Sequence, residues 1–238
     1  MTTVATHPKQ HRTCRIVFLA VLATVVSAAF APAGAARTEV SPSRDAVRTW
    51  TIRYTAHNGV VRRAYVILPA WYGPKHNPPL PLVISPHGRG ANGLQNADFW
   101  DTMPAVGGFA VISPDGMGRT LALYSYGDPG QIDDLAKMPE FATKALPWLR
   151  IDRSRIYALG SSMGGQETLL LVARHPELLA GAAAMDSVTD LALRYRQLLD
   201  LGCNARCLEQ NGKPLGEVLQ DAMSREVGGG TPETAPGA

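Results

Sequence analysis

Residues 155–173 read Arg-Ile-Tyr-Ala-Leu-Gly-Ser-Ser-Met-Gly-Gly-Gln-Glu-Thr-Leu-Leu-Leu-Val-Ala, and the rest of the chain can be placed by reference to this stretch. An apolar run over residues 156–159 has the length of a buried parallel strand. Residues 160–164 match the pattern G-x-S-x-G, and residues 166–173 form an apolar run that suits a helix packed on a sheet. The stretch therefore predicts a strand, a tight turn and a helix, in that order.

The serine in the middle of this turn, Ser162, is the candidate nucleophile. A serine at the tip of a strained strand-to-helix turn holds its hydroxyl clear of the sheet, and the flanking glycines let neighbouring backbone approach. The first amides of the helix carry partial positive charge, so the N–H of Met163 can donate to an oxyanion that forms on a bound carbonyl. A structural glycine-rich turn is the alternative, and the flanking strand and helix favour the functional interpretation.

A second glycine-rich turn follows a short apolar run at residues 82–85, which we expect to be a buried strand. It reads Pro-His-Gly-Arg-Gly over residues 86–90. Gly88 and Gly90 free the backbone, so an N–H of Gly88 or Arg89 can supply a second donor to the oxyanion. Each such donor is worth about 3 kcal/mol of the reaction barrier. An ordinary turn is the alternative here too.

The remaining strands and helices predict one α/β domain with a mostly parallel sheet. Residues 50–55 and 60–68 are β-rich, and Asn58-Gly59 between them favours a tight turn, so we expect an antiparallel hairpin at one edge of the sheet. In a helix expected over residues 132–149, Pro139 and Pro147 favour a kink or a late start over a straight helix. Further strands are expected over 109–113 and 179–185, a short helix over 98–103, and helices over 191–201 and 214–227.

The loop over residues 121–128 is a candidate for the wall of a pocket. It contains Tyr124, Tyr126 and Gly127. An ordinary packed surface loop is the alternative.

The first 35 residues have the pattern of an export signal. A basic segment over residues 11–15 precedes 15 apolar residues over 16–30, and residues 31–35 are small residues in A-x-A form. An uncleaved membrane anchor is the alternative, but it needs about 20 apolar residues. We therefore expect residues 1–35 to be removed and the mature chain to be secreted or periplasmic, with no membrane attachment.

The rest of this 238-residue chain, which is 45% hydrophobic, is large enough for one domain. We expect residues 36–47 to be a lead-in and residues 48–227 to be the folded domain. Residues 228–238 lack core-forming side chains, so we expect a disordered tail.

The formal charge of +3 does not indicate a nucleic-acid partner. Lys9, Arg12 and Arg15 lie in the expected signal, and without them 20 basic residues (23 minus 3) balance 20 acidic residues. A basic footprint for nucleic acid is therefore missing from the mature sequence.

Two cysteines, Cys203 and Cys207, remain in the expected mature chain. One helical turn brings their Cα atoms near the usual disulfide separation of about 5.5 to 6 Å, and an oxidising compartment favours that bond. A metal site is disfavoured because no second Cys or His pair lies near them in the sequence. Two unpaired thiols are the alternative.

Five short motifs along the chain belong together: His87-Gly88, Pro114-Asp115-Gly116, Ile151-Asp152, residues 160–165 and residues 174–177. In this order they resemble the α/β-hydrolase superfamily, and within it the secreted esterase and depolymerase group that overlaps prolyl-oligopeptidase-like hydrolases. The resemblance implies a three-layer α/β sandwich, acylation of Ser162, and an oxyanion held by Met163 and the turn with Gly88 and Arg89. It implies attack on an ester, thioester or amide carbonyl without metal or cofactor, and the expected substrate is a small or polymeric ester. An esterase is favoured over a peptidase because no propeller-like domain precedes this region.

The histidine of the family's catalytic triad has no clear counterpart. The family order is serine, acid, histidine, and only His175 follows Ser162. His175 lies 13 residues on (175 minus 162), which is roughly 15 to 20 Å along a helix, so we expect a helix-end role. His87 is expected to support its turn. Asp186 occupies an alternative acid position seen in some family members, and Asp190 is a weaker candidate.

No β-rich run follows Met185, so we expect the last two strands of the family's sheet to be absent and the chain to be truncated near residue 238. Loss of triad members leaves only the oxyanion hole and binding, so turnover is expected to be impaired. The alternatives are an inactive hydrolase-fold binding protein and a non-functional fragment.

Overall fold

The computed structural model describes residues 46–117, 126–201, 212–226 and 228–234. Every described residue belongs to one compact unit, Ser41–Ala238. The expected signal peptide, most of the lead-in and both Cys203 and Cys207 lie outside the described residues, so these predictions stay predictions.

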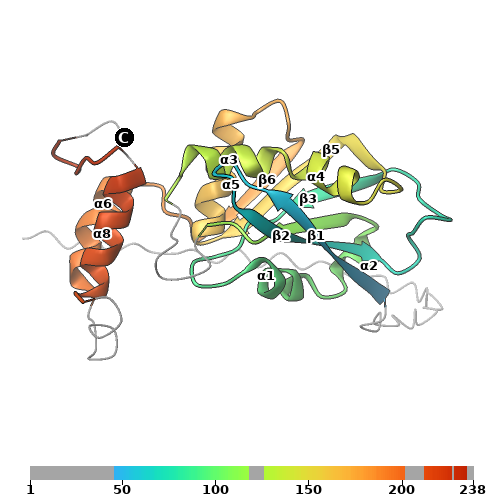
Figure 1. Ribbon diagram of the computed structural model, residues 1–238, viewed down its shortest axis with the longest axis horizontal. Coiled ribbons are helices and arrows are strands. Elements are labelled where there is room, and N and C mark those ends of the chain that lie inside the picture. Colours follow the sequence, from blue (N-terminus) through green and yellow to red (C-terminus); the bar gives the residue numbers. More distant parts are fainter. Residues whose placement is uncertain (1–45, 118–125, 202–211, 227, 235–238) are drawn as a thin grey trace, which may run out of the picture. The chain divides into compact units, whose positions relative to one another are not determined.

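The centre of this unit is a six-stranded sheet with the order β1-β2-β4-β3-β5-β6 (Figure 1). Four strands from β3 to β6 run parallel to one another, and β2 joins them antiparallel to β4. The strands are β1 (Val47–Thr55), β2 (Val61–Pro69), β3 (Leu80–Ile84), β4 (Ala110–Pro114), β5 (Ile151–Ser161) and β6 (Gly181–Met185). This arrangement confirms the predicted mostly parallel sheet.

The expected N-terminal hairpin forms the edge of this sheet. β1 and β2 pair antiparallel with Thr55 opposite Val61, so the chain reverses through Asn58-Gly59. Gly59 has a φ of +78°, a conformation that glycine adopts without strain. The hairpin prediction is confirmed, because the turn dipeptide and the alternating strands point to the same structure.

Helices cover both faces of the sheet (Figure 1). Alternate residues of β2 explain this: Val66 and Leu68 enter one apolar core, and Tyr65 and Ile67 enter the other. The first core is closed by α3 (Pro129–Ala136), α4 (Met138–Ala145) and α5 (Met163–Arg174), and the second by α1 (Gly93–Trp100). The predicted three-layer sandwich is confirmed.

Two helix predictions need correction. The short helix expected over residues 98–103 is instead two helices, α1 and α2 (Met103–Gly107). Asn92 caps α1 with a capping box that includes Gln95, and Pro104 lies in the first turn of α2. These start signals define the helices better than the apolar spacing does. The single helix expected over 132–149 is instead two helices, α3 from Pro129 and α4 to Ala145, which meet at Lys137, two residues before Pro139.

After β6, the described chain continues as helices. α6 (Leu191–Gln197) runs into the short 3₁₀ helix η2 (Leu198–Asp200), and α8 (Leu215–Glu226) follows. Leu198, Leu219 and Met223 form an apolar cluster of their own with Tyr126. Residues 228–234 contain a turn in which the N–H of Thr234 donates to the Thr231 carbonyl over 3.0 Å. Within the described ranges, no helix has both the length and the apolar character needed to cross a membrane.

Candidate functional site

Ser162 lies at a sharp turn between β5 and α5. Its backbone has φ 56° and ψ −120°, a conformation that side-chain-bearing residues rarely adopt, and the residue is exposed to solvent. The parallel strand ends at Ser161 and the helix begins at Met163, so the whole reversal falls on one residue. The predicted strand, turn and helix are confirmed, and the strained residue is the one that the sequence singled out.

Two glycines make this turn sterically possible. A Cβ on Gly160 would lie 2.3 Å from the Gly164 carbonyl oxygen, because the helix folds back over the end of the strand. A Cβ on Gly164 would lie 2.3 Å from the Pro86 carbonyl oxygen, which belongs to the other glycine-rich turn. The N-terminus of α5 and the turn after β3 are therefore in direct backbone contact.

The backbone N–H groups of Ser162 and Met163 have different roles: the first has a hydrogen-bond partner in β6, and the second lies at the start of α5. The N–H of Ser162 donates to the Met185 carbonyl of β6 over 2.8 Å, so it cannot serve an oxyanion. Met163 is the first residue of α5, where the N–H has no partner within the helix. Gly88 lies beside the same turn, since a Cβ on it would be 3.8 Å from the Ser161 carbonyl oxygen. The expected donors of Met163, Gly88 and Arg89 thus belong to adjacent backbone segments, and their role stays a prediction.

A buried polar network holds the turn after β3 in place. The Asn96 amide of α1 donates to the backbone carbonyl of Ser85 and to its Oγ, each over 2.9 Å, and the Trp100 indole donates to the same Oγ over 2.9 Å. His87 is buried, and its Nδ1 lies 2.8 Å from the Gly88 carbonyl oxygen. His87 therefore supports its own turn, as the sequence predicts.

A small pocket of about 90 Å³ opens beside Ser162. It is lined by Arg89, Tyr126, Ser162, Met163, Gln166, Val188 and Arg194. The predicted pocket loop is confirmed for Tyr126, whereas the predicted Tyr124 lies outside the described residues. Gln166, Val188 and Arg194 were not predicted, because nothing in the sequence after the turn distinguishes them from ordinary helix and loop residues.

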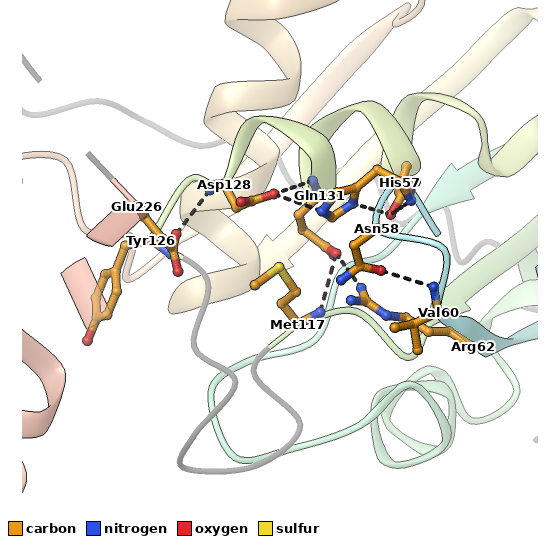
Figure 2. Close-up of polar contacts among 10 residues, drawn as sticks. His57, Asn58, Val60, Arg62, Met117, Tyr126, Asp128, Gln131 and Glu226 are labelled. Atoms are coloured by element: carbon orange, nitrogen blue, oxygen red, sulfur yellow. Dashed lines mark hydrogen bonds and ion pairs between the residues drawn. The ribbon is translucent and has the colours of Figure 1, made fainter. Parts of the chain in front are cut away.

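Glu226, at the end of α8, anchors the backbone beside this pocket (Figure 2). One carboxylate oxygen accepts a hydrogen bond from the N–H of Tyr126 and another, over 3.0 Å, from the N–H of Asp128. Burial raises the pKa of Glu226 to about 7, and the nearby Asp128 carboxylate acts in the same direction. The two N–H donors oppose this rise without cancelling it, so Glu226 is an acid that titrates near neutral pH. Sequence analysis missed this residue.

His57 clamps the N-terminal hairpin to α3 (Figure 2). Its Nδ1 lies 2.8 Å from the Asp134 Oδ2, and its Nε2 lies 3.3 Å from the Asp128 Oδ1. Its backbone N–H also donates to Asp134, which is almost wholly buried. The sequence placed His57 only in an edge loop, because its two carboxylate partners lie more than 70 residues away along the chain.

The structure separates His175 from Ser162. His175 caps the far end of α5, where its Nε2 lies 3.1 Å from Asp133. The prediction of a helix-end role is confirmed. His57 and His175 contact carboxylates, and the His87 Nδ1 contacts the Gly88 carbonyl oxygen.

The two candidate acids occupy different positions. Asp190 is the N-cap of α6, where its side chain accepts from the N–H of Leu193 over 2.8 Å, so its role is structural. Asp186 directly follows β6, is exposed, and has a φ of 49°. The Met185 carbonyl accepts the hydrogen bond from the Ser162 N–H, and Asp186 is the next residue along the chain. The role of Asp186 as the catalytic acid stays a prediction.

Ser162→Gly is expected to raise the free energy of unfolding by about 1 kcal/mol. Glycine removes a backbone strain of about 1 to 3 kcal/mol, offset by about 0.4 to 1 kcal/mol of extra freedom in the unfolded chain. Ser162→Ala keeps the strain and is the matched control. Thermal or urea unfolding of the two variants measures the difference, and an equal stability of both would contradict the assignment of strain to this residue.

The chain is similar to one protein family in sequence and to several solved structures in fold. Residues 101–204 match the model of the prolyl oligopeptidase family. FphF, a fluorophosphonate-binding serine hydrolase of Staphylococcus aureus, is 18% identical, with 76% of this chain and 74% of that chain covered and a TM-score of 0.51. A ferulic acid esterase is 18% identical, with 76% of this chain and 68% of that chain covered and a TM-score of 0.50. Esterase Est22 is 23% identical, with 60% of this chain and 45% of that chain covered and a TM-score of 0.47.

The chain spans less than half the length of Est22. It spans about two thirds to three quarters of the ferulic acid esterase and of FphF. At these identities, the likeness is one of fold.

Proposed function

Because this chain has the α/β-hydrolase fold, we propose that it is a serine hydrolase that cleaves carboxylic esters through an acyl intermediate on Ser162. The observation that carries the proposal is the backbone of Ser162, whose positive φ places an exposed hydroxyl at the turn between a parallel strand and a helix. Strain of this kind persists where the surrounding structure enforces it, and such residues gather at active sites. The match of residues 101–204 to the prolyl oligopeptidase family supports the broader class of serine hydrolase.

In this mechanism the Ser162 oxygen attacks the ester carbonyl carbon and the hydroxyl proton passes to solvent. The negative charge that forms on the carbonyl oxygen is stabilised by the N–H of Met163 and by an N–H of Gly88 or Arg89. Collapse of this intermediate breaks the bond to the alcohol, which takes a proton from solvent and leaves an acyl ester on Ser162. Water then attacks the acyl ester, the bond to the Ser162 oxygen breaks, and that oxygen takes a proton from the water as the carboxylic acid leaves.

Turnover is proposed to be slow. A serine hydroxyl is a weak nucleophile without a base. Among the described histidines, His57 binds two carboxylates, His175 binds Asp133 and the His87 ring contacts the Gly88 carbonyl. The residual rate then comes from the oxyanion donors and from binding. We further propose that the protein acts after export, on the basis of the signal pattern in residues 1–35.

A fluorophosphonate probe tests the nucleophile. We expect one label per chain in the wild type, no label in Ser162→Ala, and unchanged labelling in Ser161→Ala, the neighbouring exposed serine. Mass spectrometry of the labelled peptide identifies the residue. A label that survives Ser162→Ala would refute the proposed nucleophile. A folded wild-type chain that takes no label would favour the alternative of a hydrolase-fold binding protein.

A further inference from the structure

Two arginines form part of the wall of the pocket that opens at Ser162. Arg89 comes from the turn after β3, and Arg194 comes from α6, so about 100 residues of sequence separate two cations on one small cavity. The lining residues within the described ranges include these two cations and no carboxylate. Electrostatics therefore favour an anion in this cavity over a neutral group of the same shape.

A neutral side chain lies between these two charges. The Tyr126 phenol is hydrogen-bonded to the Arg89 guanidinium and lies close enough to Arg194 to be influenced by its charge. Burial raises the pKa of Tyr126 above its ordinary value, so the phenol is neutral at pH 7. Tyr126 is itself positioned by its backbone N–H, which donates to Glu226. The phenol therefore orients Arg89 at the pocket.

Arg194 differs from its neighbour on the same helix. Arg196 points to a carboxylate, with its Nη2 3.8 Å from the Glu233 Oε1. No ion pair with a carboxylate is found for Arg194 in the part of the chain that the structure describes. An arginine fork that lines a pocket, with no acid beside it in that lining, suits bidentate binding of a carboxylate.

We propose that the preferred substrate is an ester that carries a carboxylate close to its ester bond, with Arg194 and Arg89 as the residues that bind this carboxylate. This inference rests on the proposed function, since it assigns the substrate class of the same Ser162 site. The cavity volume of about 90 Å³ favours a short chain between the ester and the carboxylate. The same two cations would draw anionic esters toward Ser162 in solution.

Binding to the Ser162→Ala chain tests this proposal without any reaction. Two anionic esters are compared with neutral partners in which an isopropyl group replaces the carboxylate: 4-nitrophenyl hydrogen glutarate with 4-nitrophenyl 5-methylhexanoate, and butyryloxyacetate with isobutyl butyrate. The dissociation constants come from NMR titrations at low salt. We expect at least one anionic ester to bind about tenfold more tightly than its neutral partner, as a charge-assisted hydrogen bond to a partly exposed arginine provides.

Variants assign this preference to the pocket. In the Ser162→Ala background, Arg194→Gln is expected to bring the anionic and neutral esters close to parity, and Arg194→Lys is expected to keep part of the preference. Arg196→Gln removes a charge from the same helix outside the pocket and is expected to leave the preference unchanged. Salt at 0.5 M should weaken binding of the anionic ester only. Thermal unfolding verifies that each variant is folded.

The two proposals fail in distinguishable ways. Equal affinity for anionic and neutral esters in both pairs, or a preference that Arg194→Gln leaves intact, would overturn the carboxylate site even if the fluorophosphonate label appears on Ser162. A preference that depends on Arg194 in a chain that takes no label would support the carboxylate site and overturn the hydrolase.

Discussion

Gly164→Ala is expected to abolish fluorophosphonate labelling of Ser162 and to lower the free energy of unfolding by about 1 to 3 kcal/mol. The added Cβ would lie 2.3 Å from the Pro86 carbonyl oxygen and 3.0 Å from that of His87, which are backbone atoms with no side-chain freedom to move aside. The helix N-terminus and the turn after β3 must then separate. That movement parts the N–H of Met163 from the N–H groups of Gly88 and Arg89.

The matched control is Gly73→Ala. A Cβ on Gly73 would have no neighbour within 4 Å, and the backbone of Gly73 does not have a positive φ. This variant should keep the label and be as stable as the wild type or slightly more stable, because alanine reduces the freedom of the unfolded chain. Labelling rates and urea unfolding provide the two measurements. Normal labelling of Gly164→Ala would show that the close contact of the two turns is not needed for acylation.

Stability is expected to fall as the pH rises from about 5 to 8, and Glu226→Gln is expected to remove part of that fall. The pKa of Glu226 is raised to about 7 from an ordinary value of 4.5. A carboxyl group whose pKa is raised by folding stabilises the protein fully below the unfolded pKa, and this stability is lost as the pH rises through the folded pKa. The shift corresponds to a loss of at most about 3 kcal/mol.

The measurement is the difference in unfolding free energy between the wild type and Glu226→Gln across this pH range. Asp152, with its pKa lowered to about 2 by hydrogen bonds from Ser154 and Arg155, titrates outside the range. Glu217→Gln removes an exposed acid from the first turn of the same helix and should leave the pH dependence unchanged. A difference that does not vary between pH 5 and 8 would contradict the burial of the Glu226 carboxyl group.

Local sequence patterns predicted most of the scaffold because each depends on neighbouring residues. The hairpin follows from alternating side chains around Asn58-Gly59, and the turn at Ser162 follows from two glycines that flank it at fixed spacing. The prediction was weaker for α1, where the capping residues Asn92 and Gln95, rather than apolar spacing, define the start of the helix. Signals of this kind are short-range, and the backbone geometry that they require is independent of the rest of the fold.

By itself, the sequence determined that a strand, a turn and a helix would hold Ser162 at the end of a parallel sheet. Only the tertiary structure decided what surrounds that serine. Arg89, Tyr126 and Arg194 come from three separate segments, and Glu226 holds the second of them from a fourth. No residue spacing encodes such a group, because its members meet only through the packing of the layers and of the cluster between α6 and α8. The charge of the pocket, and with it the proposed substrate class, is therefore a property of the folded chain.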